Sequence, residues 1–251
     1  MINKVIHYIW LGGKEEPEIL QKCKASWKKY CPDYEIKRWD ESNLDLDECK
    51  YAREAYEAKK FAFASDYLRL KVLYNEGGIY LDVDVKLLKP LDDFLNEQFF
   101  TGFEKGDKFC VAPGLICGAE KGSPVLKDIL DSYTDASFIK EDGNYDLTTI
   151  CERTTSILEK FGLKRIDQTQ RGEGWVVFAS EYFCPLSWDK IEKKKTKNTH
   201  SIHLYYASWK GKKSLKEKCK WLLKKVLGRK RYNKIMERRY EKKDSKKNTS
   251  K

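Results

Sequence analysis

Two carboxylates, Asp82 and Asp84, stand inside the otherwise apolar segment Ile79–Leu88. A strand core rarely carries carboxylates unless a cation or a polar ligand offsets the cost of desolvating them. Side chains alternate along a strand, so both carboxylates are expected on one face, with Cα atoms roughly 6–7 Å apart. Hard oxygen ligands at this spacing favour a divalent ion, Mn²⁺ or Mg²⁺. An exposed edge strand and a glycoside hydrolase that uses both carboxylates are the alternatives. The apolar neighbours argue against the exposed edge.

The elements before this segment would position the two carboxylates. Residues 61–75 are predicted to form a helix whose buried face carries Phe63, Tyr67, Leu70 and Tyr74. Asp66 and Arg69 lie three residues apart and therefore share another face of that helix, where they could also form a simple intrahelical ion pair. Gly77 and Gly78 supply a left-handed stop. The pattern thus predicts a helix, a glycine turn and the strand that bears Asp82 and Asp84.

Alternating strands and helices along the rest of the chain predict an α/β fold with a largely parallel sheet. The predicted strands are 5–11, 34–39, 79–88, 99–103, 111–116, 175–183 and 201–206, and the predicted helices are 17–30, 44–58, 61–75, 124–133 and 148–161. Ser123 and Pro124 are a typical helix start.

The order Ser65-Asp66-x-x-Arg69, Gly77-Gly78 and Tyr80-Leu81-Asp82-Val83-Asp84 resembles glycosyltransferase family 32, the DXD-motif sugar transferases, and the catalytic domains of the large clostridial glucosylating toxins. The first strand, Ile6–Gly13, the segments Cys31–Tyr34 and Arg38–Asp40, and the closing segment His200–Trp209 are similar too. The resemblance covers roughly residues 2–209. It implies a GT-A-type fold, a nucleotide-sugar donor, a saccharide acceptor and retention of anomeric configuration.

The resemblance also implies roles for individual residues. Asp82, Asp84, Arg69 and Trp209 are the expected catalytic residues, and Asp82, Asp84 and His203 are the expected metal ligands. The donor-binding residues expected from the resemblance are Ile9, Trp10, Ser65, Asp66, Arg69, Tyr80, Asp82, Ser208 and Trp209. Core packing for Trp10, a structural role for His203 and a surface role for Trp209 remain the alternatives. Residues 112–116 are expected to border the acceptor cleft.

The positive charge of the chain is concentrated at its C-terminal end. The net charge is +11, but residues 210–251 hold 19 Lys and Arg against four acids, so the first 209 residues carry −4. Leu215, Cys219, Leu222, Leu223, Val226 and Leu227 recur at helical spacing among the lysines. A basic amphipathic helix is typical of a membrane-surface anchor. Packing on the catalytic domain and contact with nucleic acid are the alternatives.

These patterns predict three regions: a GT-A catalytic domain at 1–209, a basic amphipathic helical extension at 210–240, and a disordered basic tail at 241–251. The start of the chain lacks the apolar core of a signal peptide. None of the eight cysteines forms a CxxC pair, which argues against a structural zinc site. We therefore expect reduced thiols and a cytoplasmic enzyme bound peripherally to the inner face of the cytoplasmic membrane.

The leading hypothesis is a metal-dependent hexosyltransferase that uses a UDP-linked donor and extends a capsule, an exopolysaccharide or a lipid-linked oligosaccharide. An effector-type transferase that modifies a protein is the closest alternative. A nucleic-acid-binding protein that uses the basic tail is the alternative from another class, although no nucleic acid is expected as a partner of the enzyme.

Overall fold

The structure is a computed structural model, and it describes residues 1–106, 108–206, 215–228 and 231–236. Its strands are β1 (Val5–Ile9), β2 (Glu35–Trp39), β3 (Gly78–Tyr80), β4 (Val85–Leu87), β5 (Phe99–Gly102), β6 (Cys117–Ala119), β7 (Gln170–Gly172), β8 (Trp175–Phe178) and β9 (Ser201–His203). Seven of them form one sheet in the order β2-β1-β3-β6-β5-β8-β7, and β4 pairs with β9 in a second, two-stranded sheet. Within the larger sheet β1, β2, β3, β5 and β8 run in one direction, and β6 and β7 run against them. The predicted mixed, mostly parallel α/β sheet is confirmed.

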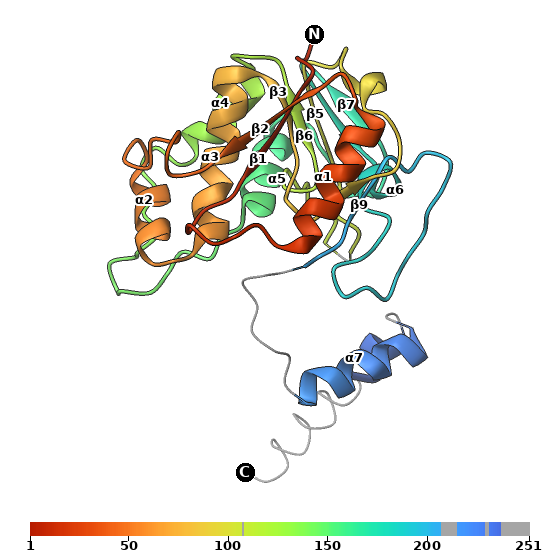
Figure 1. Cartoon of the computed structure of the whole chain (residues 1–251). Helices are drawn as coiled ribbons and strands as arrows, with labels where there is room; N and C mark the ends of the chain where they lie inside the picture. The colour runs from red at the N-terminus through yellow and green to blue at the C-terminus, as the bar shows by residue number, and fades with distance from the viewer. Residues whose placement is uncertain (107, 207–214, 229–230, 237–251) are drawn as a thin grey trace.

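Helices cover both faces of the large sheet (Figure 1). They are α1 (Glu18–Tyr30), α2 (Lys50–Glu57), α3 (Phe61–Glu76), α4 (Pro124–Asp131), α5 (Ile150–Lys160), α6 (Ser180–Phe183) and α7 (Leu215–Leu227), with a 3₁₀ turn at Asp92–Phe94. One hydrophobic core lies between the sheet and α2 to α5. A second core lies on the opposite face, where α1 and α6 pack with β4. In β3, Ile79 enters the second core and Tyr80 the first, as expected for alternating strand residues.

Four of the predicted helices are confirmed with shifts of one to two residues at their ends. The Ser123 and Thr149 hydroxyls accept hydrogen bonds from the backbone N–H groups of Leu126 and Glu152, which caps α4 and α5. The helix predicted at 44–58 begins only at Lys50. Before it, the side chains of Asp40 and Asp45 accept backbone N–H groups two residues ahead. Such local hydrogen bonds compete with helix formation.

The prediction of one continuous strand at 79–88 is wrong. Strand β3 ends at Tyr80, and Asp82 to Asp84 form a turn in which the Val85 N–H donates to the Asp82 carbonyl at 3.0 Å. The chain then leaves the large sheet as β4 and pairs with β9. The two carboxylates therefore lie in a turn just beyond the carboxyl end of β3 and not inside the sheet.

Two other predicted strands end early, and one is misplaced. Residues 111–116 form a turn that contains Pro113 and Gly114, and the strand predicted there is β6, at Cys117–Ala119. The strand predicted at 175–183 ends at Phe178 and is followed by α6, because the Asp167 carboxylate accepts the Ser180 N–H and hydroxyl. The strand predicted at 201–206 ends at His203.

Helix α7 confirms a helix within the predicted basic extension, and residues 231–236 are helical as well. The predicted disordered tail at 241–251 lies outside the described residues. The three region boundaries stay predictions. Among the helices of the described residues, none combines the length and the apolar character needed to cross a bilayer.

A buried histidine fixes the turn that leads into β3. The Trp39 indole N–H donates to His7 Nδ1 at 3.0 Å, so His7 Nε2 carries the proton and donates to the Gly77 carbonyl at 2.8 Å. A Cβ on Gly78 would lie 2.8 Å from His7 Nε2, and its φ of +102° also requires glycine. Burial lowers the pKa of His7 to about 4.

This neutral histidine should make folding stability sensitive to acid. The unfolded chain binds a proton at a pKa near 6.5 and the folded chain only near 4, so stability is complete above about pH 6.5 and falls as the pH drops through that window. The expected loss is about 2 kcal/mol at pH 5. Urea unfolding at pH 7.5 and pH 5 would measure it, and His7→Gln should lose this part of the pH dependence. An equal pH dependence in both proteins would contradict the assignment.

Candidate functional site

Three potential metal ligands meet at the carboxyl end of β3. The atoms that Asp82, Asp84 and His203 offer lie within 4.8 Å of one another, although His203 is 119 residues beyond Asp84 in sequence. His203 Nε2 lies 2.9 Å from Asp84 Oδ1 and 3.9 Å from Asp82 Oδ2. Pairing of β4 with β9 sets Val85 opposite His203 and thereby closes this triad. The structure therefore brings the predicted ligands together.

Asp84 is the most firmly held member of the triad. Its side chain is buried, and Oδ2 accepts the Tyr206 backbone N–H at 2.7 Å. Burial by itself would raise the pKa of Asp84, but His203 and the Tyr206 N–H outweigh burial and lower it. Burial likewise opposes a charge on His203, yet the two carboxylates raise the pKa of the imidazole. Asp84 is thus an anion whose geometry is fixed before any ligand arrives.

Asp82 is oriented by a network from α3 and β3. Its Oδ1 accepts the Tyr80 hydroxyl at 3.0 Å and lies 3.1 Å from Arg69 Nη1. The Arg69 guanidinium stands 4.8 Å from the centre of the Tyr80 ring. Burial raises the pKa of Tyr80 well above its usual value, so the phenol keeps its proton and donates. Because these contacts engage Oδ1, the other oxygen of Asp82 faces His203.

Arg69 also ties the site to the interior of α3. Its guanidinium is buried and donates to the Ser65 carbonyl and hydroxyl at 3.0 and 2.9 Å, and Nη2 lies 3.1 Å from Asp66 Oδ1. Asp66 Oδ2 accepts the Ile150 N–H at the start of α5, at 3.2 Å. Burial raises the pKa of Asp66 to about 6, although Arg69 opposes that shift. Ser65, Asp66 and Arg69 therefore form a buried clamp behind Asp82.

Ile9 and Trp10 close β1 at the same edge of the sheet. Strand β1 is the parallel neighbour of β3, so both strands end on the side where Asp82 lies. Ile9 is buried in the core, whereas Trp10 is half-buried and its indole N–H donates to the Lys14 carbonyl at 2.7 Å. Predicted residues Ser208 and Trp209 lie outside the described residues. The donor-binding roles of all these residues stay predictions.

The donor set suits a divalent cation. Two carboxylates and one imidazole are ligands that Mn²⁺ accepts, and Mg²⁺ would use chiefly the oxygens. His203 Nδ1 is buried and makes no hydrogen bond to the described residues. If Nδ1 carries the proton, the lone pair of Nε2 points toward the two carboxylates. Nε2 is then the nitrogen that can bind a metal ion. The residues present therefore fit the ion.

Several residues near the triad carry no sequence signal that marks them. The Tyr205 ring packs edge-on against the His203 ring, with centroids 4.2 Å apart, and its hydroxyl donates to Glu104 at 3.0 Å. Cys184 Sγ lies 3.1 Å from the same hydroxyl. Tyr205 adopts a φ of +49°, which is unusual for a tyrosine. These groups fix the plane of the His203 ring.

Gly114 lies in the segment expected to border the acceptor cleft, and its backbone closely approaches Asp82 and Arg69. Its carbonyl accepts the Asp82 N–H at 3.0 Å. A Cβ at this position would lie 2.5 Å from Arg69 Nη1 and would also clash with the Asp82 carboxylate. The clamp therefore leaves no room for a side chain at position 114.

Gly114→Ala should therefore impair the site while the fold survives. Displacing Asp82 and Arg69 by several tenths of an ångström is expected to lower donor turnover about tenfold to a hundredfold. Gly106→Ala is the matched control, because a Cβ there meets no atom within 4 Å. Steady-state donor hydrolysis with saturating metal would measure the effect. Equal rates in the two variants would refute the close contact of Gly114 with Asp82 and Arg69.

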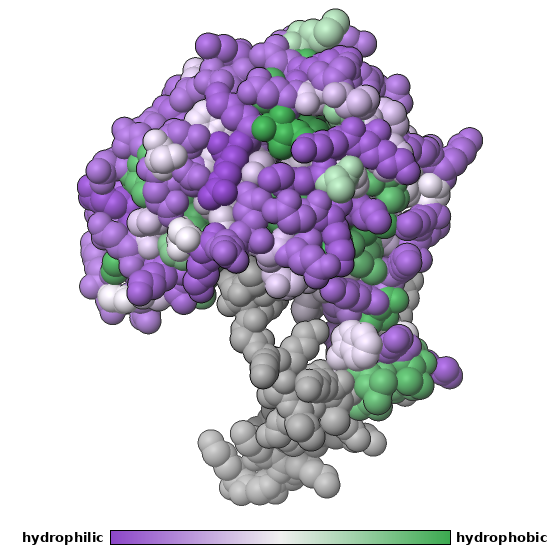
Figure 2. Space-filling model, in the orientation of Figure 1, coloured by the Kyte–Doolittle hydropathy of each residue, from purple (hydrophilic) through white to green (hydrophobic). Residues whose placement is uncertain are grey.

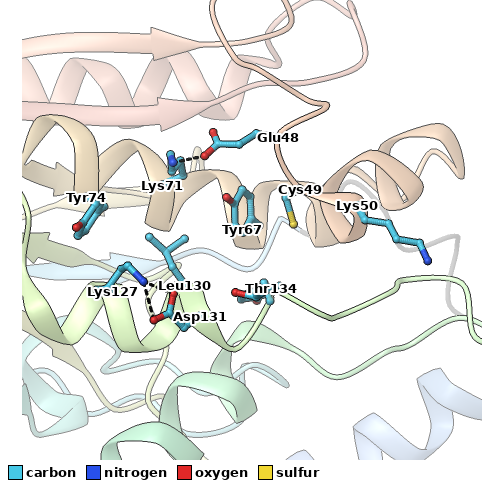
Figure 3. A pocket seen from close by; sticks show the side chains of 11 residues that line it. Glu48, Cys49, Lys50, Tyr67, Lys71, Tyr74, Lys127, Leu130, Asp131 and Thr134 are labelled. Atoms are coloured by element: carbon cyan, nitrogen blue, oxygen red, sulfur yellow. Dashed lines mark hydrogen bonds and ion pairs between the residues drawn. The ribbon is translucent and has the colours of Figure 1, made fainter.

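A separate hollow of about 260 Å³ opens beside α3 and α4 (Figure 3). Its charged groups are already paired, Lys71 with Glu48 and Lys127 with Asp131. Tyr67 and Leu130 line the same space (Figure 3). It contains no member of the triad, which lies at the end of β3.

Part of the chain matches a known protein family. Residues 17–101, which contain both carboxylates and the clamp, match the family described as "Glycosyltransferase sugar-binding region containing DXD motif". An uncharacterized glycosyltransferase of Acanthamoeba polyphaga mimivirus is 25% identical over 218 residues, which are 83% of this chain and 84% of that protein. The "Subversion of eukaryotic traffic protein A" of Legionella pneumophila is 26% identical over 172 residues, 56% of this chain, but this chain spans only 26% of its length.

Among solved structures, one titled "PaToxG Glycosyltransferase" is similar, with 21% identity and a TM-score of 0.49 over 63% of this chain and 69% of that chain.

Proposed function

Because this chain belongs to the glycosyltransferase family whose sugar-binding region contains the DXD motif, we propose that it transfers a hexose from a UDP-linked sugar to a glycan acceptor with retention of configuration. The observation that carries the proposal is the triad of Asp82, Asp84 and His203, held next to the buried Arg69 at the carboxyl end of β3. Ligands of mostly parallel sheets bind at this end of the strands.

The residues of the site have different roles in the proposed transfer. Asp82, Asp84 and His203 would hold a divalent cation, which would supply positive charge to the departing diphosphate. Asp84 and His203 hold that position, and Tyr80 and Arg69 orient Asp82 toward it. The contacts of the clamp are already formed without a donor, and preorganised groups of this kind favour a charged transition state. Trp10, at the end of β1, is available for the nucleobase.

The acceptor is proposed to be a surface polysaccharide or a lipid-linked oligosaccharide, and the enzyme to work at the inner face of the cytoplasmic membrane. The net charge of +15 in residues 210–251 supports that location. A protein acceptor is the second candidate, which the resemblance to the large clostridial glucosylating toxins suggests. Radiolabelled sugar in a lipid-extractable product would favour the first candidate, and label in a protein band the second.

Donor hydrolysis tests the proposal directly. The purified chain would be incubated with a panel of nucleotide sugars in Mn²⁺ or in EDTA, and the released nucleotide would be counted. We expect release from one UDP-sugar in Mn²⁺ and none in EDTA. Absence of release from every donor, together with no nucleotide-dependent change in melting temperature, would refute the transfer reaction.

A further inference from the structure

Helix α7 is joined to a lysine-rich loop of the catalytic body. The Trp221 indole N–H donates to the Asp189 carbonyl at 2.6 Å, which sets α7 against the loop at residues 186–197. In Figure 1, α7 lies outside the layers of the α/β domain, on the side where this loop protrudes. The Trp221 side of the helix thus faces the protein.

The other side of α7 exposes large apolar side chains. Leu222, Leu223 and Val226 are 57%, 52% and 75% exposed, and their spacing of three and four residues puts them on one face. Trp188, next to the residue that Trp221 contacts, is 51% exposed. Figure 2 shows green, hydrophobic surface over α7 beneath the largely purple body. We call Leu222, Leu223 and Val226 the apolar face, and Trp188 is a further exposed aromatic residue on the adjoining loop.

Positive charge surrounds this apolar face. The sequence of α7 contains five lysines and one glutamate. Lys225 is exposed on the helix. The loop exposes five further lysines: Lys190, Lys193, Lys194, Lys195 and Lys197. A soluble surface seldom combines exposed leucine and valine on one helix with so many lysines nearby.

We propose that the apolar face and its lysines bind an anionic lipid bilayer, with α7 lying in the membrane surface and Trp188 at the level of the headgroups. The apolar side chains would enter the acyl boundary while the lysines contact acidic headgroups. Tryptophan favours this depth because its ring is apolar and its N–H is polar.

The charge and the apolar character of this surface favour a bilayer over other binding partners. A second copy of the chain would bring one lysine border against another, which repulsion disfavours. Nucleic acid would satisfy the lysines but would leave Leu222, Leu223 and Val226 in water. An anionic bilayer satisfies both features together.

Membrane binding would keep the transfer site close to the lipid surface. His203 and the first residue of α7 are separated by twelve positions, so the chain between them spans at most about 40 Å. An acceptor carried on a lipid would then lie within reach of the triad. The binding itself does not depend on the proposed transfer, and its test uses no enzymatic readout.

Vesicle flotation tests the proposal with the full-length chain. Vesicles of phosphatidylglycerol and phosphatidylcholine would be compared with vesicles of phosphatidylcholine alone, at 50 mM and 500 mM salt. We expect flotation with the acidic vesicles at low salt and at least tenfold weaker partitioning to neutral vesicles. Leu222→Ser with Val226→Ser, and separately Lys224→Glu with Lys225→Glu, should each reduce partitioning at least tenfold.

Matched variants keep the test specific. Leu147→Ser removes an exposed leucine elsewhere (61% exposed), and Lys28→Glu with Lys29→Glu reverses two exposed charges on α1. Both should float like the unmodified chain, whereas Trp188→Ala should float less. Circular dichroism would confirm that each variant is folded.

Three results would overturn the proposal. The first is no flotation of the folded chain with acidic vesicles. The second is flotation that the Leu222→Ser and Val226→Ser pair leaves unchanged, because charge attraction alone would then explain it. The third is a dimer in light scattering, or a complex with DNA or RNA, that this pair abolishes while flotation persists.

Discussion

Asp84→Asn is expected to lower metal-dependent donor hydrolysis on the order of 10³-fold and to abolish the rise in melting temperature that Mn²⁺ gives. Asp84 is the buried anion of the triad, and its oxygens contact His203 and the Tyr206 N–H. Asparagine has the same shape and can still accept the Tyr206 N–H, so the loop after β9 should stay in place. What disappears is the negative charge that a divalent ion requires.

The control for this variant is another carboxylate that also accepts a backbone N–H. Asp167 is partly buried and accepts the backbone N–H and the hydroxyl of Ser180, both at 2.6 Å, but belongs to no metal triad. Asp167→Asn should bind Mn²⁺ and hydrolyse the donor like the unmodified chain. A Mn²⁺-induced shift that persists in Asp84→Asn would place the ion elsewhere.

The helix–glycine–carboxylate segment was predictable because each of its signals is local. Gly77 and Gly78 end helix α3 with positive φ angles, as expected. The helix is buried on nearly all sides, so the predicted face is only part of its buried surface: Phe63 and Tyr74 are only partly buried. Asp82 and Asp84 stand out because carboxylates are costly in apolar surroundings. The turn between them was missed because an apolar run does not reveal where a strand leaves its sheet.

Contacts between distant segments were harder to predict. His203 could be named as a ligand only through the resemblance, since nothing local indicates that β9 pairs with β4. Glu104 and Tyr205, which fix the His203 ring, are ordinary polar residues in the sequence. The contacts of the Asp66 carboxylate with Arg69 and the start of α5 could not be predicted either, and its donor-binding role stays a prediction. Side-chain direction on a helix depends on neighbours that the sequence does not place.

Arg69→Met should be the most destabilising substitution at the site. The guanidinium is buried and compensates Asp66, whose carboxylate is buried too, while it also pairs with Asp82. Removing one partner of a buried ion pair leaves an uncompensated charge, which costs about 3–5 kcal/mol. Urea unfolding at pH 8 would measure the loss. Arg171→Met is the matched control, since Arg171 is an exposed partner of Glu97 and should contribute less than about 1 kcal/mol.

The pH dependence of this loss identifies its cause. Burial already raises the pKa of Asp66 to about 6, and losing Arg69 would raise it further. A folded-state pKa above the unfolded value means that the folded chain binds the proton more tightly. The variant therefore gains stability relative to the unmodified chain as the pH falls from the further raised pKa of its Asp66 toward 6, where Asp66 of the unmodified chain becomes protonated too. Arg69→Met should therefore be less destabilised at pH 5 than at pH 8. Adding Asp66→Asn should recover part of the loss at pH 8 and remove most of the pH dependence. A loss that is equal at both pH values, and unchanged by Asp66→Asn, would show that Arg69 acts through packing or Asp82 and not by compensating Asp66.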